Sequence, residues 1–181
     1  MFKKLIILLL LTIFLLSTIP FFYLINYSQT ITLKEEKVVY EMPYPGILPD
    51  HPLYSLKIVR DRSLDFITRE KIEKAKLYLL FSDKRIKMGE ALVKKGKNDL
   101  AISTASKAEK YFLKIPILLQ ESKKQGNAPT QELINKIKSS NIKHKEIIQN
   151  FLKEIPEGEQ HRIQEILQIN TLIKKQLSDL K

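Results

Sequence analysis

Side chains able to perform catalysis or bind a metal are few and scattered along this chain of 181 residues. The three histidines are His51, His144 and His161, and none has the His-x-x-x-His or Glu-x-x-His spacing that places two metal ligands on one helical face. The absence of cysteine excludes a thiolate nucleophile, a zinc site with cysteine ligands and a disulfide scaffold. We therefore expect no metal site.

Motifs for cofactor binding and nucleophilic catalysis are also missing from the sequence. The chain has only 5 glycines, and it contains neither a glycine-rich phosphate loop nor a Gly-x-Ser-x-Gly nucleophile turn. Its acidic residues alternate with lysines along the expected helices, which is the usual pattern of solvated charge. We expect a protein that is not an enzyme, with no catalytic residue and no cofactor.

Positive charge is the one suggestive surface feature. The chain has 31 Lys and Arg against 20 Asp and Glu, a net charge of +11, and the excess is concentrated in residues 69–124. Close to a membrane, such a basic hairpin would suit anionic lipid headgroups or wall polymers, although a lysine-rich surface that only confers solubility explains it as well. Nucleic acid is not an expected partner, because no pattern of interleaved aromatic and basic residues supports it.

The first structural element along the chain is an apolar stretch from Leu5 to Ile25, preceded by Lys3 and Lys4. Its length matches the roughly 20 residues that span a bilayer, and no small-x-small cleavage site follows it. Residues 1–26 are therefore expected to form a single-pass anchor, with the N-terminus inside and the bulk of the chain outside the cell membrane. The alternative is a cleaved signal and a secreted protein, because Pro20 would shorten the helix.

Residues 27–51 are expected to form a linker that ends in a proline-rich strap. Four prolines between positions 43 and 52 favour extended backbone. The strap is either a polyproline recognition segment or a stiff tether that lays Ile47 and Leu48 onto the domain, and we favour the tether. Pro52 suits a first helical position, so a helix is expected from there to about residue 68, with Asp50 or His51 as its cap.

The start of that short helix is expected to be buried. If the strap packs on the domain, Leu53 and Tyr54 are buried, and Leu53→Ala is costly to stability.

Residues 52–181 are expected to form an all-α bundle of two antiparallel helical hairpins, because apolar residues recur there at steps of three and four. The first hairpin turns at residues 95–98, the second near Glu157, and Pro116 should kink the first. Asn127-Ala-Pro-Thr and Pro156 are helix-start signals. Facing positions pair large with small in the first hairpin: Val93 with Ala101, Gly89 with Ala105, Ile86 with Ala108, Ser82 with Phe112, Leu79 with Ile115 and Ala75 with Leu119.

The second hairpin pairs Phe151 with Ile163, Ile148 with Ile166, Ile137 with Leu177 and Ile134 with Leu180. In its middle, His144 falls opposite Asn170. We interpret these two as a polar pair that fixes the register of the seam, in preference to a ligand or proton donor. Replacing both by leucine is then expected to be neutral or stabilising.

The run Tyr44-Pro-Gly-Ile-Leu-Pro-Asp-His-Pro-Leu-Tyr-Ser-Leu-Lys57, followed by a charged helix with Ala75, Asp83, Lys84 and Arg85, resembles the bacterial domain-of-unknown-function family 5667. The resemblance covers about residues 43–125. It implies a short extracytoplasmic helical domain behind a signal or anchor, and it implies no functional residue. We expect a role in protein interaction or envelope scaffolding, with binding of anionic lipid or wall polymer through residues 69–124 as the alternative, and the sequence leaves the oligomeric state open.

Overall fold

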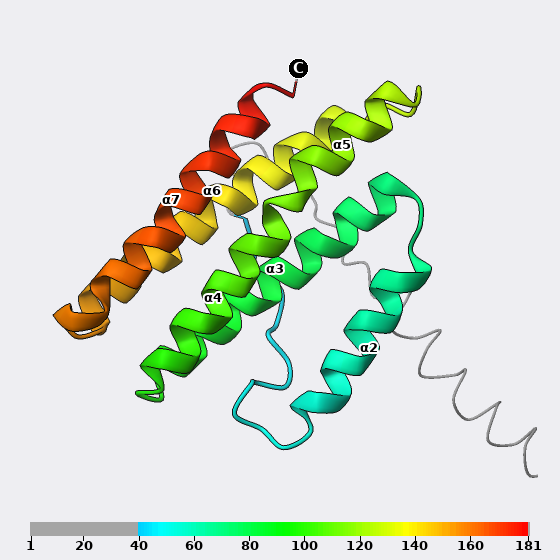
Figure 1. Cartoon of the computed structure of the whole chain (residues 1–181). Coiled ribbons are helices and arrows are strands. Elements are labelled where there is room, and N and C mark those ends of the chain that lie inside the picture. The colour runs from blue at the N-terminus through cyan, green and yellow to red at the C-terminus, as the bar shows by residue number, and fades with distance from the viewer. Residues whose placement is uncertain (1–39, 181) are drawn as a thin grey trace, which may run out of the picture. The chain divides into compact units, whose positions relative to one another are not determined.

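The computed structural model describes residues 40–180, which form helices joined by short turns after a segment of irregular backbone and turns at residues 40–53 (Figure 1). The helices are α2 (Tyr54–Ile67), α3 (Lys71–Val93), α4 (Asn98–Phe112), α5 (Lys114–Lys124), α6 (Gln131–Glu154) and α7 (Gln160–Ser178), with a 3-10 turn η1 (Glu157–Glu159) before α7. The predicted all-α class is confirmed, and no strand occurs in this part of the chain.

The predicted membrane segment from Leu5 to Ile25 lies outside the described residues. From residue 40 to residue 180, no helix combines the length and the apolar character that crossing a membrane requires.

Two antiparallel helix pairs make up the bundle. Helix α3 packs against α4 and its continuation α5, and α6 packs against α7. The pairs then associate, with α6 on α3 and α7 on α4, so that the α3–α4 and α6–α7 turns lie at the same end of the bundle (Figure 1). Helix α2 lies on the opposite side of α3 from α6 and α7.

The apolar stripes predicted for both hairpins are buried throughout. Gly89 shows how closely α3 and α4 approach each other. A Cβ atom at this position would lie 3.3 Å from the carbonyl oxygen of Ala101 and 3.2 Å from Cζ of Phe151. The sequence pattern therefore selected the correct faces, because only small residues fit where two helix backbones meet.

The predicted kink at Pro116 takes the form of a short interruption. Helix α4 ends at Phe112 and α5 begins at Lys114. Proline has no N–H for the carbonyl group four residues earlier, and its ring crowds that carbonyl, so the helix breaks one turn before it. Phe112 and Ile115 stay fully buried across the break.

The helix starts were predicted well for α6 and poorly for α2. The Thr130 hydroxyl accepts the N–H of Leu133 at 3.2 Å, which caps α6 where the Asn127-Ala-Pro-Thr signal placed it. Helix α2 begins at Tyr54 without a side-chain cap. Asp50 instead forms ion pairs with Lys95 and Lys97, 3.1 and 2.9 Å away, because that turn presents two cations to it.

The strap is a tether, but not an apolar one. Leu53 is 50% exposed and Ile47 is also exposed, so the expected burial of Leu53 is wrong; Tyr54 is half-buried. The proline-rich segment offers carbonyl groups and few N–H donors, and Lys57 takes them: its Nζ donates to the carbonyls of Pro45 and Ile47 at 3.1 and 3.4 Å. Within residues 40–53, the only buried residue is Tyr40.

Ser82 provides a test of the packing in the first hairpin. It is fully buried, and its hydroxyl donates to the carbonyl of Tyr78, four residues earlier, at 2.8 Å. Ser82→Leu should overpack the seam and lower the free energy of unfolding by about 1–3 kcal/mol, measured by urea denaturation. Ser63→Leu is the matched control, because Ser63 is exposed on α2 and bonds back to Val59 in the same way. Equal effects of the two substitutions would contradict the packing.

Candidate functional site

A layer of polar side chains divides the core of the bundle into two apolar halves. One half fills the end that holds the α3–α4 and α6–α7 turns, and the other fills the opposite end. Each helix of the two pairs contributes one principal residue to the layer between them: Asp83 from α3, Glu109 from α4, His144 from α6 and Asn170 from α7. All four are at least 98% buried.

His144 is the centre of this layer, which we call the polar layer. Its Nδ1 lies 2.7 Å from Oε1 of Glu109, and its Nε2 lies 2.9 Å from Oδ1 of Asp83. Because each ring nitrogen faces a carboxylate oxygen, the arrangement suits an imidazolium that donates from both nitrogens. One cation from α6 thereby joins an anion from α3 to an anion from α4.

The remaining acceptors of the two carboxylates also have donors. The Ser140 hydroxyl donates to Asp83 Oδ1 at 2.6 Å, and the Tyr40 hydroxyl donates to Oδ2 of the same carboxylate. Asn170 donates to Glu109 Oε2 at 3.3 Å and to the carbonyl of Asn141 at 3.1 Å. Since Tyr40 precedes the strap, the polar layer also fastens the incoming chain to the bundle.

Charge and burial act against each other on His144. Burial alone would lower its pKa, because a charged ring is poorly solvated in the core. The charges of Glu109 and Asp83 and their hydrogen bonds outweigh that penalty and raise the pKa of His144 to about 9. Burial and the charge of Asp83 raise the pKa of Tyr40 as well, so its hydroxyl keeps the proton that it donates.

The predicted pair of His144 and Asn170 therefore needs correction. Both are in the seam, but His144 binds Asp83 and Glu109, and Asn170 reaches it only through Glu109. Replacing His144 and Asn170 by leucine would leave two buried carboxylates without a cation, a loss of about 3–5 kcal/mol in place of the neutral outcome expected. The interpretation of the acidic residues as solvated charge is wrong for Asp83 and Glu109.

A signal for these carboxylates was present in the sequence. Asp83 stands four residues after Leu79, and Glu109 stands four residues after Ala105, so each lies on a face of its helix that was predicted to be buried. A charged residue on such a face requires a buried partner.

The polar layer is closed to small molecules. Within residues 40–180, no group of three His, Asp or Glu side chains is arranged to hold a metal ion. The described part has a single buried side-chain polar atom without a hydrogen-bond partner, Oε1 of Gln176. The ring of Phe112 covers His144 edge to face at 5.1 Å. His51 and His161 are exposed elsewhere, so the three histidines remain apart. Chemically, the layer can fix the packing and hold a proton.

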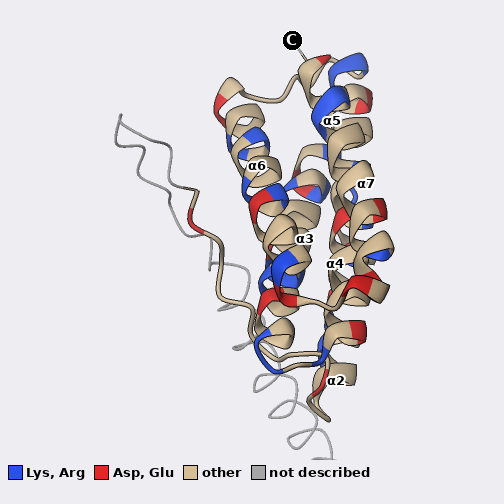
Figure 2. Cartoon of the chain, turned by 90° about the vertical axis from the view of Figure 1, so that its left-hand side faces the viewer, with Lys and Arg blue, Asp and Glu red and all other residues tan. Residues whose placement is uncertain are grey.

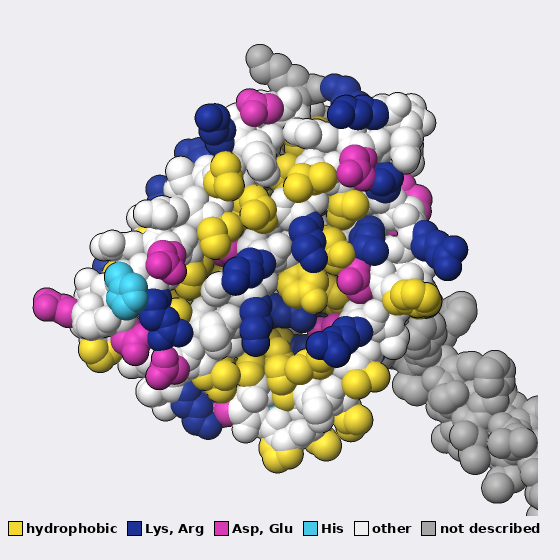
Figure 3. Space-filling model, viewed as in Figure 1, with side chains coloured by type: hydrophobic (Ala, Val, Ile, Leu, Met, Phe, Trp, Pro, Cys, Tyr) yellow, Lys and Arg dark blue, Asp and Glu magenta, His cyan; other side chains and the backbone are white. Residues whose placement is uncertain are grey.

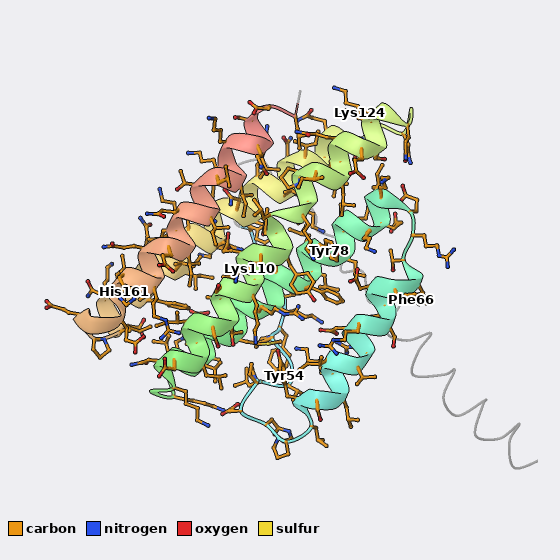
Figure 4. The ribbon with its side chains drawn as sticks, in the orientation of Figure 1. Tyr54, Phe66, Tyr78, Lys110, Lys124 and His161 are labelled. Carbon is orange, nitrogen blue, oxygen red and sulfur yellow. The ribbon has the colours of Figure 1, made fainter. Side chains whose placement is uncertain are left out.

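The side of α2 that faces the bundle carries buried and half-buried charges beside Leu64, which packs on the apolar core. Asp61, the fully buried residue of this helix, accepts from Arg85 Nη2 at 3.3 Å. The guanidinium of Arg85 in turn lies over the ring of Tyr111, 4.5 Å from its centroid. One turn further along α2, Asp65 accepts from the Tyr78 hydroxyl at 2.7 Å, and Figure 4 shows Tyr78 between α3 and the neighbouring helices. Ion pairs and aromatic rings thus hold α2 in place.

The side of α2 that faces away from the bundle is apolar. Leu56, Val59 and Phe66 are 66%, 62% and 76% exposed, and Ile67 is 54% exposed. Figure 3 shows hydrophobic side chains along this lower right edge of the molecule, and Figure 4 shows Phe66 on the outer side of α2. A surface helix ordinarily turns its apolar face inward. Apart from Leu64, which packs on the core, the amphipathic pattern of α2 is inverted. Sequence reasoning missed this inversion, because the helix pattern gives the two faces and not their orientation.

The basic hairpin at 69–124 has less free charge than its composition suggests. Lys and Arg are interleaved with Asp and Glu along the helices (Figure 2). Many cations of this segment pair with carboxylates within 4 Å, namely Lys71, Lys74, Lys76, Arg85, Lys87, Lys94, Lys95 and Lys97. Lys107 and Lys110 remain exposed, one turn apart on α4.

Comparison with known proteins agrees with the resemblance in the strap and extends it. Residues 46–176 match a family described as "Domain of unknown function (DUF5667)", so the match includes most of the second hairpin as well as the first. No curated protein and no solved structure matches the chain.

The proton on His144 gives a pH dependence. A histidine in the unfolded chain has a pKa of about 6.5, so its stabilising effect is complete below pH ~6.5 and is lost as the pH rises through about 9. We expect the urea midpoint to fall over that interval and the His144 ring protons to titrate near pH 9 by NMR. His161→Ala, at an exposed position of α7, should keep the same slope. Titration of His144 near or below pH 6.5 would contradict the ion pairs.

Proposed function

This chain belongs to the domain-of-unknown-function family DUF5667, and we propose that it acts as a membrane-anchored helical interaction domain outside the cytoplasmic membrane. Its role is non-enzymatic: it presents a fixed surface to a partner at the cell envelope, in protein interaction or scaffolding. The N-terminal stretch from Leu5 to Ile25 supplies the anchor.

The observation that supports this proposal is the outward apolar face of α2. Apolar side chains that gather on one face of a surface helix mark a candidate site of contact with proteins or membranes. Leu56, Val59 and Phe66 are each more than 60% exposed and follow one another at helical spacing, so they form one surface. We call this surface the α2 face.

The bundle behind the α2 face is suited to be a rigid support. Its polar side chains bind one another in the polar layer, and its apolar stripes are buried. Arg85 carries the connection from the bundle to α2, since it donates to Asp61 of α2 and to the carbonyl of Phe81 in α3, at 3.3 and 3.0 Å. A contact surface held in this way binds without the cost of ordering a mobile segment.

The alternative partner, an anionic wall polymer or lipid bound by the basic hairpin, has narrower support. It rests on the exposed Lys107, Lys110 and Lys114 of α4 and α5, since most cations of α3 and of the α3–α4 turn already have carboxylate partners.

The placement of the chain can be tested by its topology. A reporter fused after Lys181 should be active outside the cytoplasmic membrane, and extraction of the full chain should require detergent. Release of a soluble form that begins near residue 28 would show that the N-terminal segment is a cleaved signal, and activity of the reporter inside the cell would contradict the proposed orientation.

The α2 face can be tested by photochemical cross-linking in intact cells. A photoreactive amino acid in place of Val59 should form covalent adducts with an envelope component, whereas the same group in place of Ile142 should not. Ile142 is a matched control because it is 63% exposed, against 62% for Val59, but lies on α6. The absence of adducts at position 59, or the same adducts at both positions, would contradict an interaction surface on α2.

A further inference from the structure

We propose that the α2 face docks on the lipid bilayer that holds the chain's own anchor, so that α2 lies flat in the membrane interface. This inference rests on the proposed membrane anchoring, and it narrows the proposed envelope contact of the α2 face to lipid in place of a protein partner.

The composition of α2 is that of an interfacial helix. Its exposed apolar residues recur at steps of three and four along the outer side: Leu56, Val59, Phe66 and Ile67, with the small Ser63 between them. Arg60 and Arg62 border this stripe on its two sides. Arg60 pairs with the buried Asp61, whereas Arg62 is exposed. An apolar face bordered by an exposed arginine suits a bilayer surface, because the aliphatic part of Arg62 can lie along the acyl chains while its guanidinium reaches the headgroups.

The contacts behind α2 keep this face directed outward. Asp61 is held by Arg60 and Arg85, at 2.6 and 3.3 Å. Asp65 is held by Lys74 and Tyr78, at 3.2 and 2.7 Å. These contacts direct the apolar side of the helix outward, as docking on a flat surface requires.

The tether keeps the domain within reach of the bilayer. Residues 26–39 separate the expected membrane segment from Tyr40, which the polar layer fixes to the bundle through Asp83. Even when fully extended, such a linker spans at most about 50 Å. The α2 face is thus confined near a membrane surface at a high effective concentration, and weak intrinsic affinity is sufficient for docking.

The size of the α2 face favours a bilayer over a protein. The helix has 14 residues, so it is about 21 Å long, and one face of it covers a few hundred Å² at most. A stable protein–protein interface needs about 800 Å² from each partner. The exposed Arg62 beside this face is complemented by anionic headgroups.

The absence of tryptophan permits a direct test. Phe66→Trp introduces a single tryptophan, which can be excited selectively, at an exposed position of the α2 face. We expect that the full chain, reconstituted in phosphatidylethanolamine–phosphatidylglycerol vesicles, loses about half of its tryptophan emission when the lipids carry brominated acyl chains, because the indole contacts those chains. Ile142→Trp on α6 is the control, and its emission should be unchanged.

Arg62→Glu, added to the Phe66→Trp chain, tests the border charge. It should reduce the quenching in vesicles that contain phosphatidylglycerol and restore emission toward that of the control, since a carboxylate is repelled by anionic headgroups. Unchanged quenching in this variant would overturn the role given to the arginine border.

Three results would overturn lipid docking by the α2 face. Emission from Phe66→Trp that brominated lipids leave unchanged would do so, and so would equal quenching of the two tryptophan variants. Cross-linking of two copies through Cys introduced by Phe66→Cys, in a chain whose tryptophan variant is not quenched, would assign the α2 face to self-association. In each case, detergent-dependent extraction of the chain would still support the proposed anchoring, whereas extraction without detergent would overturn the anchoring itself.

Discussion

The fold depends on one buried histidine between two buried carboxylates. Asp83 and Glu109 come from the first hairpin and His144 from the second, so neither hairpin can bury its charged groups alone. Apolar stripes would tolerate many relative positions of the two pairs, because hydrophobic contact is non-directional. Two hydrogen-bonded ion pairs on one imidazole accept only one position. The polar layer thus sets the register between hairpins, and Tyr40 uses the same layer to set where the chain enters the domain.

Buried charged contacts also determine the orientation of α2. Charged groups that elsewhere face water are used here on the inner side, where Asp61 meets Arg85 and Asp65 meets Tyr78. The apolar side chains of α2 are consequently left outside. Burial of a paired charge contributes little net stability compared with apolar packing. A helix that buries its charges and exposes its apolar side chains is therefore expected where the exposed face contacts a partner. The interior of the bundle is thereby saturated with its own partners, and the surface that remains available for function is an apolar helix face.

Much of the core could be predicted from the sequence, and the central site could not. The three-four spacing identified both buried stripes, and the small residue Gly89 marked the close approach of α3 and α4, because helical periodicity is local information. The strap was predicted less well. Leu53 is exposed, and Lys57 holds the strap through its carbonyl groups. Asp50 caps no helix, since Lys95 and Lys97 bind it from distant positions. His144 was assigned to the correct seam, but its partners belong to the other hairpin.

The sequence by itself determined the helical class, the stripes of the two hairpins, the break before Pro116 and the apolar character of residues 5–25, because each follows from spacing or from the chemistry of one residue. Only the tertiary structure decided which groups share the centre and which face of α2 is left outside. Those outcomes depend on how the hairpins stack, and stacking brings together residues such as Asp83 and His144 that are 61 positions apart. Residue spacing within one helix does not indicate which residues of another helix pack against it. The cation that pairs with a buried carboxylate is therefore identified only in the tertiary structure.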